Sequence, residues 1–143
     1  MIAVDTNVLI QAHRQEMPRH AQALRRLTDL AQGDAAWGIP VFCIGEFLRV
    51  VTHPKVFRPP SSIEEALQAL EGLLEAPTVR ILSPGPRYPE LLAGLIRSAK
   101  VSGNLVFDAQ IAALCREHAV EGLLILDRDF SRFPEVPTLG LAG

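Results

Sequence analysis

Four carboxylates stand where strands and helices could present them to one site. Asp5 directly follows the apolar residues 1–4, and Asp127 directly follows the apolar residues 123–126. A short apolar run of this kind predicts a buried strand. In an open α/β sheet, ligands bind at the carboxyl ends of such strands. Glu46 and Asp108 fall within expected helices that could close the same cleft.

Each of these acids also has a simpler interpretation. Asp5 could serve only to cap the following helix, in a turn that Thr6 and Asn7 also favour. Glu46 lies opposite the apolar stripe of its helix and could pair with Arg49 at the surface. Asp108 follows a candidate N-cap, Asn104, and could be a surface acid that the helix dipole favours. These alternatives stay open for each residue considered alone.

A shared cleft would give the four acids a common chemistry. Like charges at close range raise one another's pKa values, and a bound cation removes that conflict. Mg²⁺ and Mn²⁺ prefer carboxylate oxygens. One or two such ions would lower the pKa of a bound water and orient a phosphodiester for hydrolysis. Thr6 could then hydrogen-bond a water or a carboxylate of the site.

The rest of the chain predicts a single α/β domain over residues 1–143. Strands and helices alternate, which favours a mainly parallel sheet with helices on both faces. The expected strands are residues 1–4, 36–39, 78–82, 123–126 and 136–139, and the expected helices are residues 8–14, 19–32, 41–52, 63–75, 89–100 and 105–118. Right-handed crossovers would bring Asp5 and Asp127 to neighbouring strand ends.

Composition excludes several other classes of protein. Hydrophobic residues make up 48% of the chain and charged residues 21%, which is ordinary for a soluble domain. The apolar runs are too short to span a membrane, and no signal-peptide pattern opens the chain, so we expect a cytoplasmic protein. Cys43 and Cys115 are expected to be buried free thiols, and the four histidines form no zinc pattern. The net charge of −2 argues against nucleic-acid binding unless metal ions offset the acids.

These motifs resemble those of PIN-domain nucleases, in particular the toxin ribonucleases of VapBC toxin–antitoxin pairs. The matching segments are Asp5-Thr6-Asn7, the stretch around Glu46 in residues 44–51, Asp108-Ala109 after Asn104, and residues 127–130. The resemblance covers essentially the whole chain. A single Asp-Thr-Asn is weak evidence, whereas all four segments in order are specific.

The resemblance implies a fold, an activity and partners. The fold would be a three-layer α/β/α PIN-like domain with about five mainly parallel strands. The activity would be Mg²⁺- or Mn²⁺-dependent cleavage of RNA, and the partners would be a second copy of the chain and a VapB-type antitoxin. The metal ligands would be Asp5, Glu46, Asp108 and Asp127, with Asp129 as an additional acid. Thr6, Asn7 and Asn104 would support them.

One position departs from the resemblance. Many relatives carry a threonine or serine two residues before the late acid, and this chain has Ile125 there. A hydroxyl beside Asp127 is therefore missing. Asp129 either supports the metal or caps the short turn that follows it. Candidate contacts to RNA phosphates, each of which could instead be an ordinary solvated charge, are Arg49, Lys55, Arg58, Arg128 and Arg132.

Two rival functions are compatible with part of this pattern. Phosphatases of the haloacid-dehalogenase type also place an aspartate after the first strand. They need a second aspartate two residues later, where this chain has Asn7, and a lysine in the site. The other rival is a catalytically silent PIN scaffold that only binds RNA or protein, against which the intact acids argue.

Overall fold

The computed structural model describes residues 1–126 and 130–142 of the chain. Within these residues it contains five strands and six helices, with a pair of helices between each two successive strands among the first four. The strands are β1 (Ile2–Val4), β2 (Trp37–Pro40), β3 (Val79–Leu82), β4 (Gly122–Leu124) and β5 (Thr138–Leu139). The helices are α1 (Thr6–His13), α2 (His20–Gln32), α3 (Val41–Val51), α4 (Ile63–Leu74), α5 (Tyr88–Ala99) and α6 (Leu105–Glu117).

The five strands form one sheet in the order β3-β2-β1-β4-β5, and every pair is parallel. The central strands are almost wholly buried, and all four residues of β2 are buried. The edge strand β5 is exposed. Continuous apolar strands such as β2 and β4 are expected where helices cover both faces of a parallel sheet.

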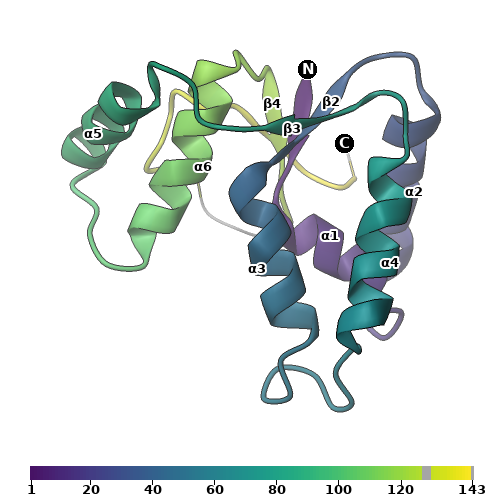
Figure 1. Cartoon of the computed structure of the whole chain (residues 1–143). Coiled ribbons are helices and arrows are strands. Elements are labelled where there is room, and N and C mark those ends of the chain that lie inside the picture. The colour runs from purple at the N-terminus through teal and green to yellow at the C-terminus, as the bar shows by residue number, and fades with distance from the viewer. Residues whose placement is uncertain (127–129, 143) are drawn as a thin grey trace.

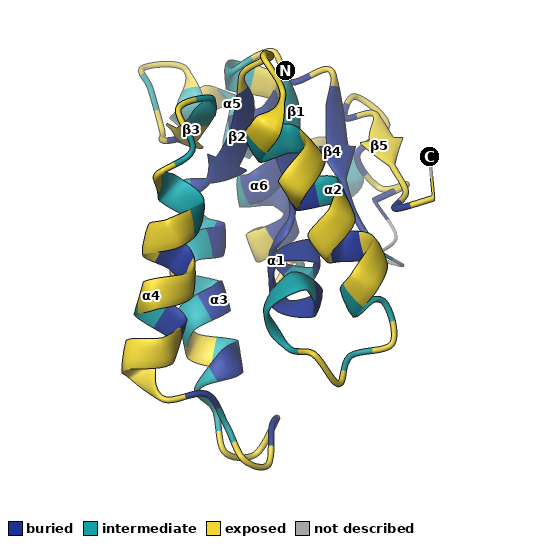
Figure 2. Cartoon of the chain, turned by 90° about the vertical axis from the view of Figure 1, so that its right-hand side faces the viewer, coloured by how far each residue is buried: buried dark blue, intermediate teal, exposed yellow. Residues whose placement is uncertain are grey.

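The helices divide between the two faces of the sheet (Figure 1). The helices α1 to α4 pack against one another on one side, whereas α5 packs on α6 on the other. Figure 2 shows that the outer faces of α2 and α4 are exposed and that their inner faces are buried. The chain moves from β1 outward to β2 and β3, then crosses back to β4 on the other side of β1. The strand order therefore reverses between β1 and β4, which is where open α/β sheets bind ligands.

Most predicted boundaries are confirmed within one residue, but three differ by two residues. The first helix begins at Thr6, because the chain leaves the sheet at Asp5 and turns at once. The fourth strand ends at Leu124, two residues before the end of the apolar run. The last strand holds only Thr138 and Leu139, since Pro137 has no amide to donate.

Within the described residues, no helix combines the length and the apolar character needed to cross a bilayer.

Candidate active site

Asp5 is fully buried at the carboxyl end of β1, with an exposed fraction of 0%. Its amide donates a hydrogen bond to the carbonyl of Leu124 in β4 over 3.0 Å, which fixes the residue beside the neighbouring strand. Asp5 occupies the N-cap position of α1, yet its side chain makes no capping hydrogen bond. Capping therefore does not account for a carboxylate at this costly buried position.

Asp108 lies in the first turn of α6 and is also buried, with an exposed fraction of 8%. The positive end of the α6 dipole favours a carboxylate there. The interpretation of Asp108 as a surface acid is wrong, because its side chain faces into the fold with Ala112 and Cys115, four and seven residues further along the same helical face.

Glu46 is half-buried on α3, where it lines a groove of about 590 Å³ between α3 and α6. The apolar stripe predicted for this helix was Ile44, Phe47, Leu48 and Val51. Phe47 and Val51 are buried as expected, whereas Ile44 and Leu48 are only half-buried and Cys43 is buried as well. The buried face is thus rotated towards Glu46. Within the described residues no ion pair joins Glu46 to Arg49, so the predicted alternative of a surface pair is not formed.

The Cys43 thiol lies within the electrostatic reach of two of the predicted acids. Burial raises its pKa well above the usual range, and the charges of Asp5 and then Glu46 raise it further. Burial, followed by the charge of Asp5, likewise raises the pKa of Cys115 to about 12. Both cysteines are free and buried, as predicted. Asp5 is therefore placed between α3 and α6.

The Thr6 hydroxyl is buried next to Asp5 and stands out as an orphaned polar atom. Among the described residues it has no hydrogen-bond partner of ordinary geometry. The Cys43 thiol, a weak hydrogen-bonding group, lies beside it. A buried hydroxyl left in this state is costly. At this position the hydroxyl could make a hydrogen bond to a ligand or to a neighbouring acid. Asn7, the next residue of α1, is half-buried.

The late acids of the motif, Asp127 and Asp129, and the neighbouring Arg128 lie outside the described residues. The strand that leads to them, β4, pairs directly with β1 in the register Val4 to Leu124. Ile125 is buried and packs in the core, as an apolar residue at this position should. Within residues 1–126 and 130–142, no three acidic, cysteine or histidine side chains form a group able to hold a metal ion.

The candidate RNA contacts are dispersed over the surface. Arg49 is exposed and lines the groove between α3 and α6 together with Glu46. Lys55 and Arg58 are exposed in the loop 53–60, beyond the end of α3 that is remote from the sheet (Figure 1). Arg132 is exposed after β4. Arg49 is thus the described basic residue that shares a groove with a predicted acid.

Sequence reasoning missed the aromatic part of this groove. Its remaining lining residues are Phe42, Asn104, Phe107, Gln110 and Ile111. Asn104 stands at the predicted N-cap of α6 but makes no capping hydrogen bond, and it lines the groove instead. Residues 104, 107 and 111 recur at i, i+3 and i+7, so helical spacing could have placed Phe107 on the same face as Asn104.

Comparison with known proteins agrees with the fold. A family model described as PIN domain matches residues 2–136. Ribonuclease VapC43 of Mycobacterium tuberculosis is 38% identical over 133 residues, which cover 93% of this chain and 90% of that protein. Ribonuclease VapC25 of the same organism is 35% identical over 136 residues, covering 95% of each.

Solved structures show the same architecture. VapBC-1 from nontypeable Haemophilus influenzae superposes with a TM-score of 0.71 at 19% identity, and the match covers 100% of both chains. Mycobacterium tuberculosis VapC20, described as a toxin that cleaves the sarcin–ricin loop, superposes with a TM-score of 0.64 at 21% identity, covering 92% of this chain and 93% of that one. The chain therefore belongs to the PIN-domain family, in which its relatives at 35–38% identity are VapC ribonucleases.

Proposed function

We propose that this protein is a cytoplasmic endoribonuclease that needs Mg²⁺ or Mn²⁺ and that acts as the toxin of a type II toxin–antitoxin pair. The observation that carries the proposal is the position of Asp5. It is fully buried, its side chain caps no helix, and its amide is bonded to the strand that leads to Asp127. The named activity of the VapC relatives supports the same assignment.

The residues of the site fit a hard divalent cation. The donors on offer are carboxylate oxygens, which Mg²⁺ and Mn²⁺ prefer, and the orphaned hydroxyl of Thr6 lies beside Asp5. Asp5, Glu46, Asp108 and Asp127 would hold the ions, and Asp129 would assist them. When bound, the ions supply a water of lowered pKa and neutralise charge on the phosphate.

The surrounding side chains would position the substrate and the acids. Thr6, Asn7 and Asn104 would orient carboxylates or water through hydrogen bonds. Arg49, Arg128 and Arg132 would hold RNA phosphates near the site, with Lys55 and Arg58 as more distant contacts. Because the described acids do not form a metal cluster by themselves, we expect Asp127 and the RNA phosphate to complete the coordination.

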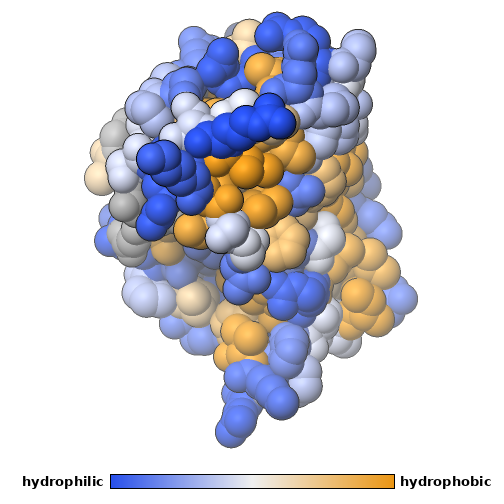
Figure 3. All heavy atoms as spheres, turned by 90° about the vertical axis from the view of Figure 1, so that its left-hand side faces the viewer, coloured by the Kyte–Doolittle hydropathy of each residue, from blue (hydrophilic) through white to orange (hydrophobic). Residues whose placement is uncertain are grey.

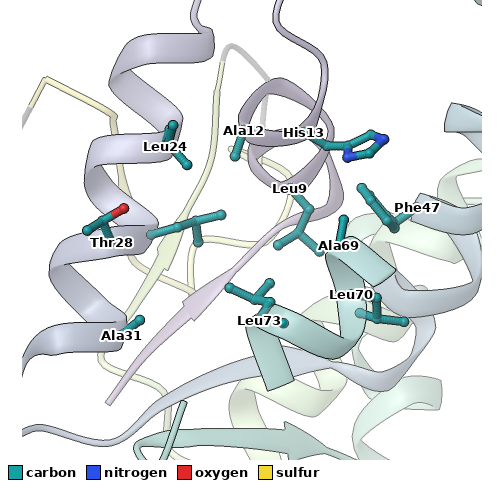
Figure 4. Close-up of a pocket in the computed structure, with 12 residues that line it drawn as sticks. Leu9, Ala12, His13, Leu24, Thr28, Ala31, Phe47, Ala69, Leu70 and Leu73 are labelled. Carbon is teal, nitrogen blue, oxygen red and sulfur yellow. The ribbon is translucent and has the colours of Figure 1, made fainter. Parts of the chain in front are cut away.

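A second groove supports the assignment of an antitoxin partner. It has a volume of about 350 Å³, lies between α1, α2 and α4, and is lined almost entirely by apolar side chains (Figure 4). Figure 4 shows Leu9 of α1 between Leu24 of α2 and Leu73 of α4. Grooves of this kind accept the apolar face of an amphipathic helix. Similar folds have been solved as VapBC complexes, so we assign this groove to the antitoxin.

We also propose a homodimer, with the surface over α5 and α6 as its interface. Figure 3 shows apolar atoms gathered on this face and hydrophilic atoms around them. In α5 only Leu95 is fully buried, while Leu91, Leu92 and Ile96 remain half-buried. A contiguous apolar area of this kind marks an interaction surface. Sedimentation velocity would give the mass in solution, and a monomer at all concentrations would contradict this assignment.

The phosphatase alternative is not favoured. Its site requires a lysine near the first aspartate, but Lys55 is exposed in the loop after α3 and Lys100 is exposed at the end of α5. Asn7 occupies the position of the second aspartate. A silent scaffold is also less favoured, because burial of Asp5 and Asp108 costs stability that a scaffold would have no reason to lose.

The test compares wild type with Asp5→Asn on labelled RNA, with Mn²⁺ or with EDTA. Loss of a ligand that stabilises charge by several kcal/mol should slow cleavage by about 10²-fold or more, and EDTA should abolish it. Asp29→Asn, which changes an exposed aspartate of α2, is the matched control and should cleave like wild type. Cleavage that ignores both the substitution at Asp5 and the metal would contradict the proposal.

Metal binding can be measured independently of cleavage. Mn²⁺ should raise the melting temperature of wild type, because a ligand that binds only the folded state stabilises it. The same concentration should have little effect on Asp5→Asn. Equal shifts in the two proteins would place the cation elsewhere.

A further inference from the structure

The groove between α3 and α6 has a composition that the proposed metal site does not require. It holds about 590 Å³ and is lined by two aromatic rings, two amides, one acid and one arginine, together with Ile111. Phe42 forms part of its wall and packs on Tyr88, with ring centroids 6.1 Å apart. The wall of the groove at Phe42 is thus backed by a second aromatic ring.

Phe107 is the most unusual residue of this groove. Its exposed fraction is 60%, the highest among the large apolar side chains in the described part of the chain. A single exposed apolar residue needs no explanation by itself. Phe107, however, directly precedes the buried Asp108 and shares a groove with Glu46. Most of its side chain is therefore open to solvent in the groove that a proposed metal ligand, Glu46, also lines.

The polar groups of the groove can recognise the edge of a nucleobase. Asn104 makes no capping hydrogen bond, so its amide is not committed to α6. Gln110 lines the same groove, so its amide is also available there. Each amide carries both donors and acceptors. Single-stranded RNA is read through such contacts on bases that stack on aromatic rings.

The groove also offers a positive charge for the phosphate of a nucleotide whose base contacts the two amides. Arg49 is exposed and makes no ion pair with Glu46 within the described residues, so its guanidinium can bind a phosphate. Glu46 is the side chain assigned to the metal. An occupant would therefore meet a ring face, two amides and a cation in one groove.

We propose that this groove is a nucleobase subsite, in which an unpaired RNA base stacks on Phe107 with its edge at Asn104 and Gln110 and its phosphate at Arg49. The subsite rests on the proposed ribonuclease function and adds a substrate-positioning residue to it. Because Glu46 lines the same groove, a base held at Phe107 would bring its nucleotide to a proposed metal ligand. It also makes cleavage dependent on an unstacked nucleotide.

The test measures RNA binding by the full chain in the Asp5→Asn background, so that binding is separated from cleavage. The probes are fluorescent oligoadenylate of about 12 nucleotides, within the usual range of single-strand sites, and a strand of the same length that lacks all bases. Phe107→Ala should weaken oligoadenylate binding by about 10-fold to 100-fold, because base stacking contributes on that scale. Affinity for the base-free strand should stay unchanged.

Two further variants separate stacking from general apolar contact. Phe107→Tyr keeps the ring and should bind oligoadenylate like the parent. Phe107→Leu keeps the apolar bulk but not the ring face, so it should bind as weakly as Phe107→Ala. Recovery of binding by leucine, or an equal loss for the base-free strand, would overturn the subsite. Unchanged affinity of Phe107→Ala for oligoadenylate would also overturn the subsite. This holds whether or not sedimentation shows that the variant has lost a dimer.

The failure of this inference is distinct from failure of the proposed function. Metal-dependent cleavage by wild type, combined with binding that ignores Phe107, would remove only the subsite. Phe107-dependent binding without any cleavage by wild type would remove the nuclease and leave a base-binding groove.

Discussion

Asp5 and Thr6 are adjacent in the chain and are both fully buried, and each carries a polar group that is costly to bury. The carboxylate is costly to bury, and a cation that meets it would offset that cost. The hydroxyl has no partner of ordinary geometry among the described residues, although a hydroxyl is easily satisfied elsewhere. Each is thus retained at a cost to stability, which is typical of residues kept for function.

Thr6→Val tests the role of this hydroxyl. Valine has nearly the same shape, so the variant should be as stable as wild type or up to about 1 kcal/mol more stable, since a buried unsatisfied group is removed. Cleavage should fall by about 10- to 100-fold, as for other groups that orient metal ligands. Urea unfolding and RNA cleavage assays on one preparation measure both effects. Lower stability with normal cleavage would make Thr6 purely structural.

His13 makes folding sensitive to pH. Its pKa is lowered by burial and by Arg14, while Glu65 and Glu16 oppose the shift in part, and its Nε2 lies 2.9 Å from the Ser61 hydroxyl. A lowered pKa means that the unfolded chain binds the proton more tightly. The stability from neutral His13 is therefore complete above the unfolded pKa of about 6.5 and is lost as the pH falls through the lower folded value.

The corresponding experiment follows urea unfolding of wild type and His13→Gln between about pH 7 and pH 5, above the range in which the carboxylates titrate. Wild type should lose stability towards pH 5, and the variant should lose less over the same interval. Parallel curves for the two proteins would contradict the assignment of the pH dependence to His13.

At the scale of elements, periodicity predicted the framework because each strand and helix has its own apolar pattern. Capping residues helped as well. At the start of α4 (Ile63–Leu74), Ser62 and Glu65 form a complete capping box, which their residue types and spacing favour. Boundaries were harder to predict where tertiary contacts decide them. The fourth strand ends at Leu124, although the apolar run continues, because its partner β5 supplies only two residues.

The candidate site was predictable in its acids and less so in its surroundings. Asp5 and Asp108 follow signals that can be read locally: a strand end and a helix start. The orientation of Glu46 was harder to predict from its helix alone, because the apolar stripe expected for α3 did not include Cys43, which lies on the buried face of the helix. Phe107 was missed because the groove that it lines is formed together with α3, which is distant from it in the sequence.

Packing between β2 and β3 gives a prediction at this scale. A methyl group at Gly38 would lie 2.8 Å from the side chain of Leu82. Gly38→Ala should therefore destabilise the protein by about 1–3 kcal/mol through overpacking. Gly94→Ala, at an exposed position of α5 where an added methyl meets nothing within 4 Å, is the control. It should stabilise the protein by up to about 1 kcal/mol, as alanine does in helices. Urea unfolding distinguishes the two, and equal effects would contradict this account.

On the scale of the whole molecule, α3 contributes residues to two grooves, the groove towards α6 and the apolar groove towards α1 and α4. Glu46 lines the groove towards α6, and the adjacent Phe47 lines the apolar groove towards α1 and α4. Successive residues of a helix point about 100° apart, so one helix can serve both surfaces. Occupation of the apolar groove by an antitoxin would therefore contact the same helix that carries a proposed metal ligand.

Leu24 and Ile81 provide a matched pair for this partner surface, because both have an exposed fraction of 46%. Leu24 lines the apolar groove, whereas Ile81 lies on the edge strand β3. Leu24→Lys should weaken binding of the proposed antitoxin by about tenfold or more, since a charge in an apolar interface is costly. Ile81→Lys should bind normally, and both variants should still cleave RNA. Calorimetric titration measures the affinity, and equal effects of the two variants would place the antitoxin elsewhere.

The reversal of strand order also places the two halves of the candidate site far apart along the chain. β1 ends at Val4, whereas β4, the strand that pairs beside it, begins only at Gly122. A growing polypeptide thus carries Asp5 before it carries the strand that leads to Asp127. A chain cut short before Gly122 would therefore lack the strand beside Asp5 and would not assemble the proposed metal site.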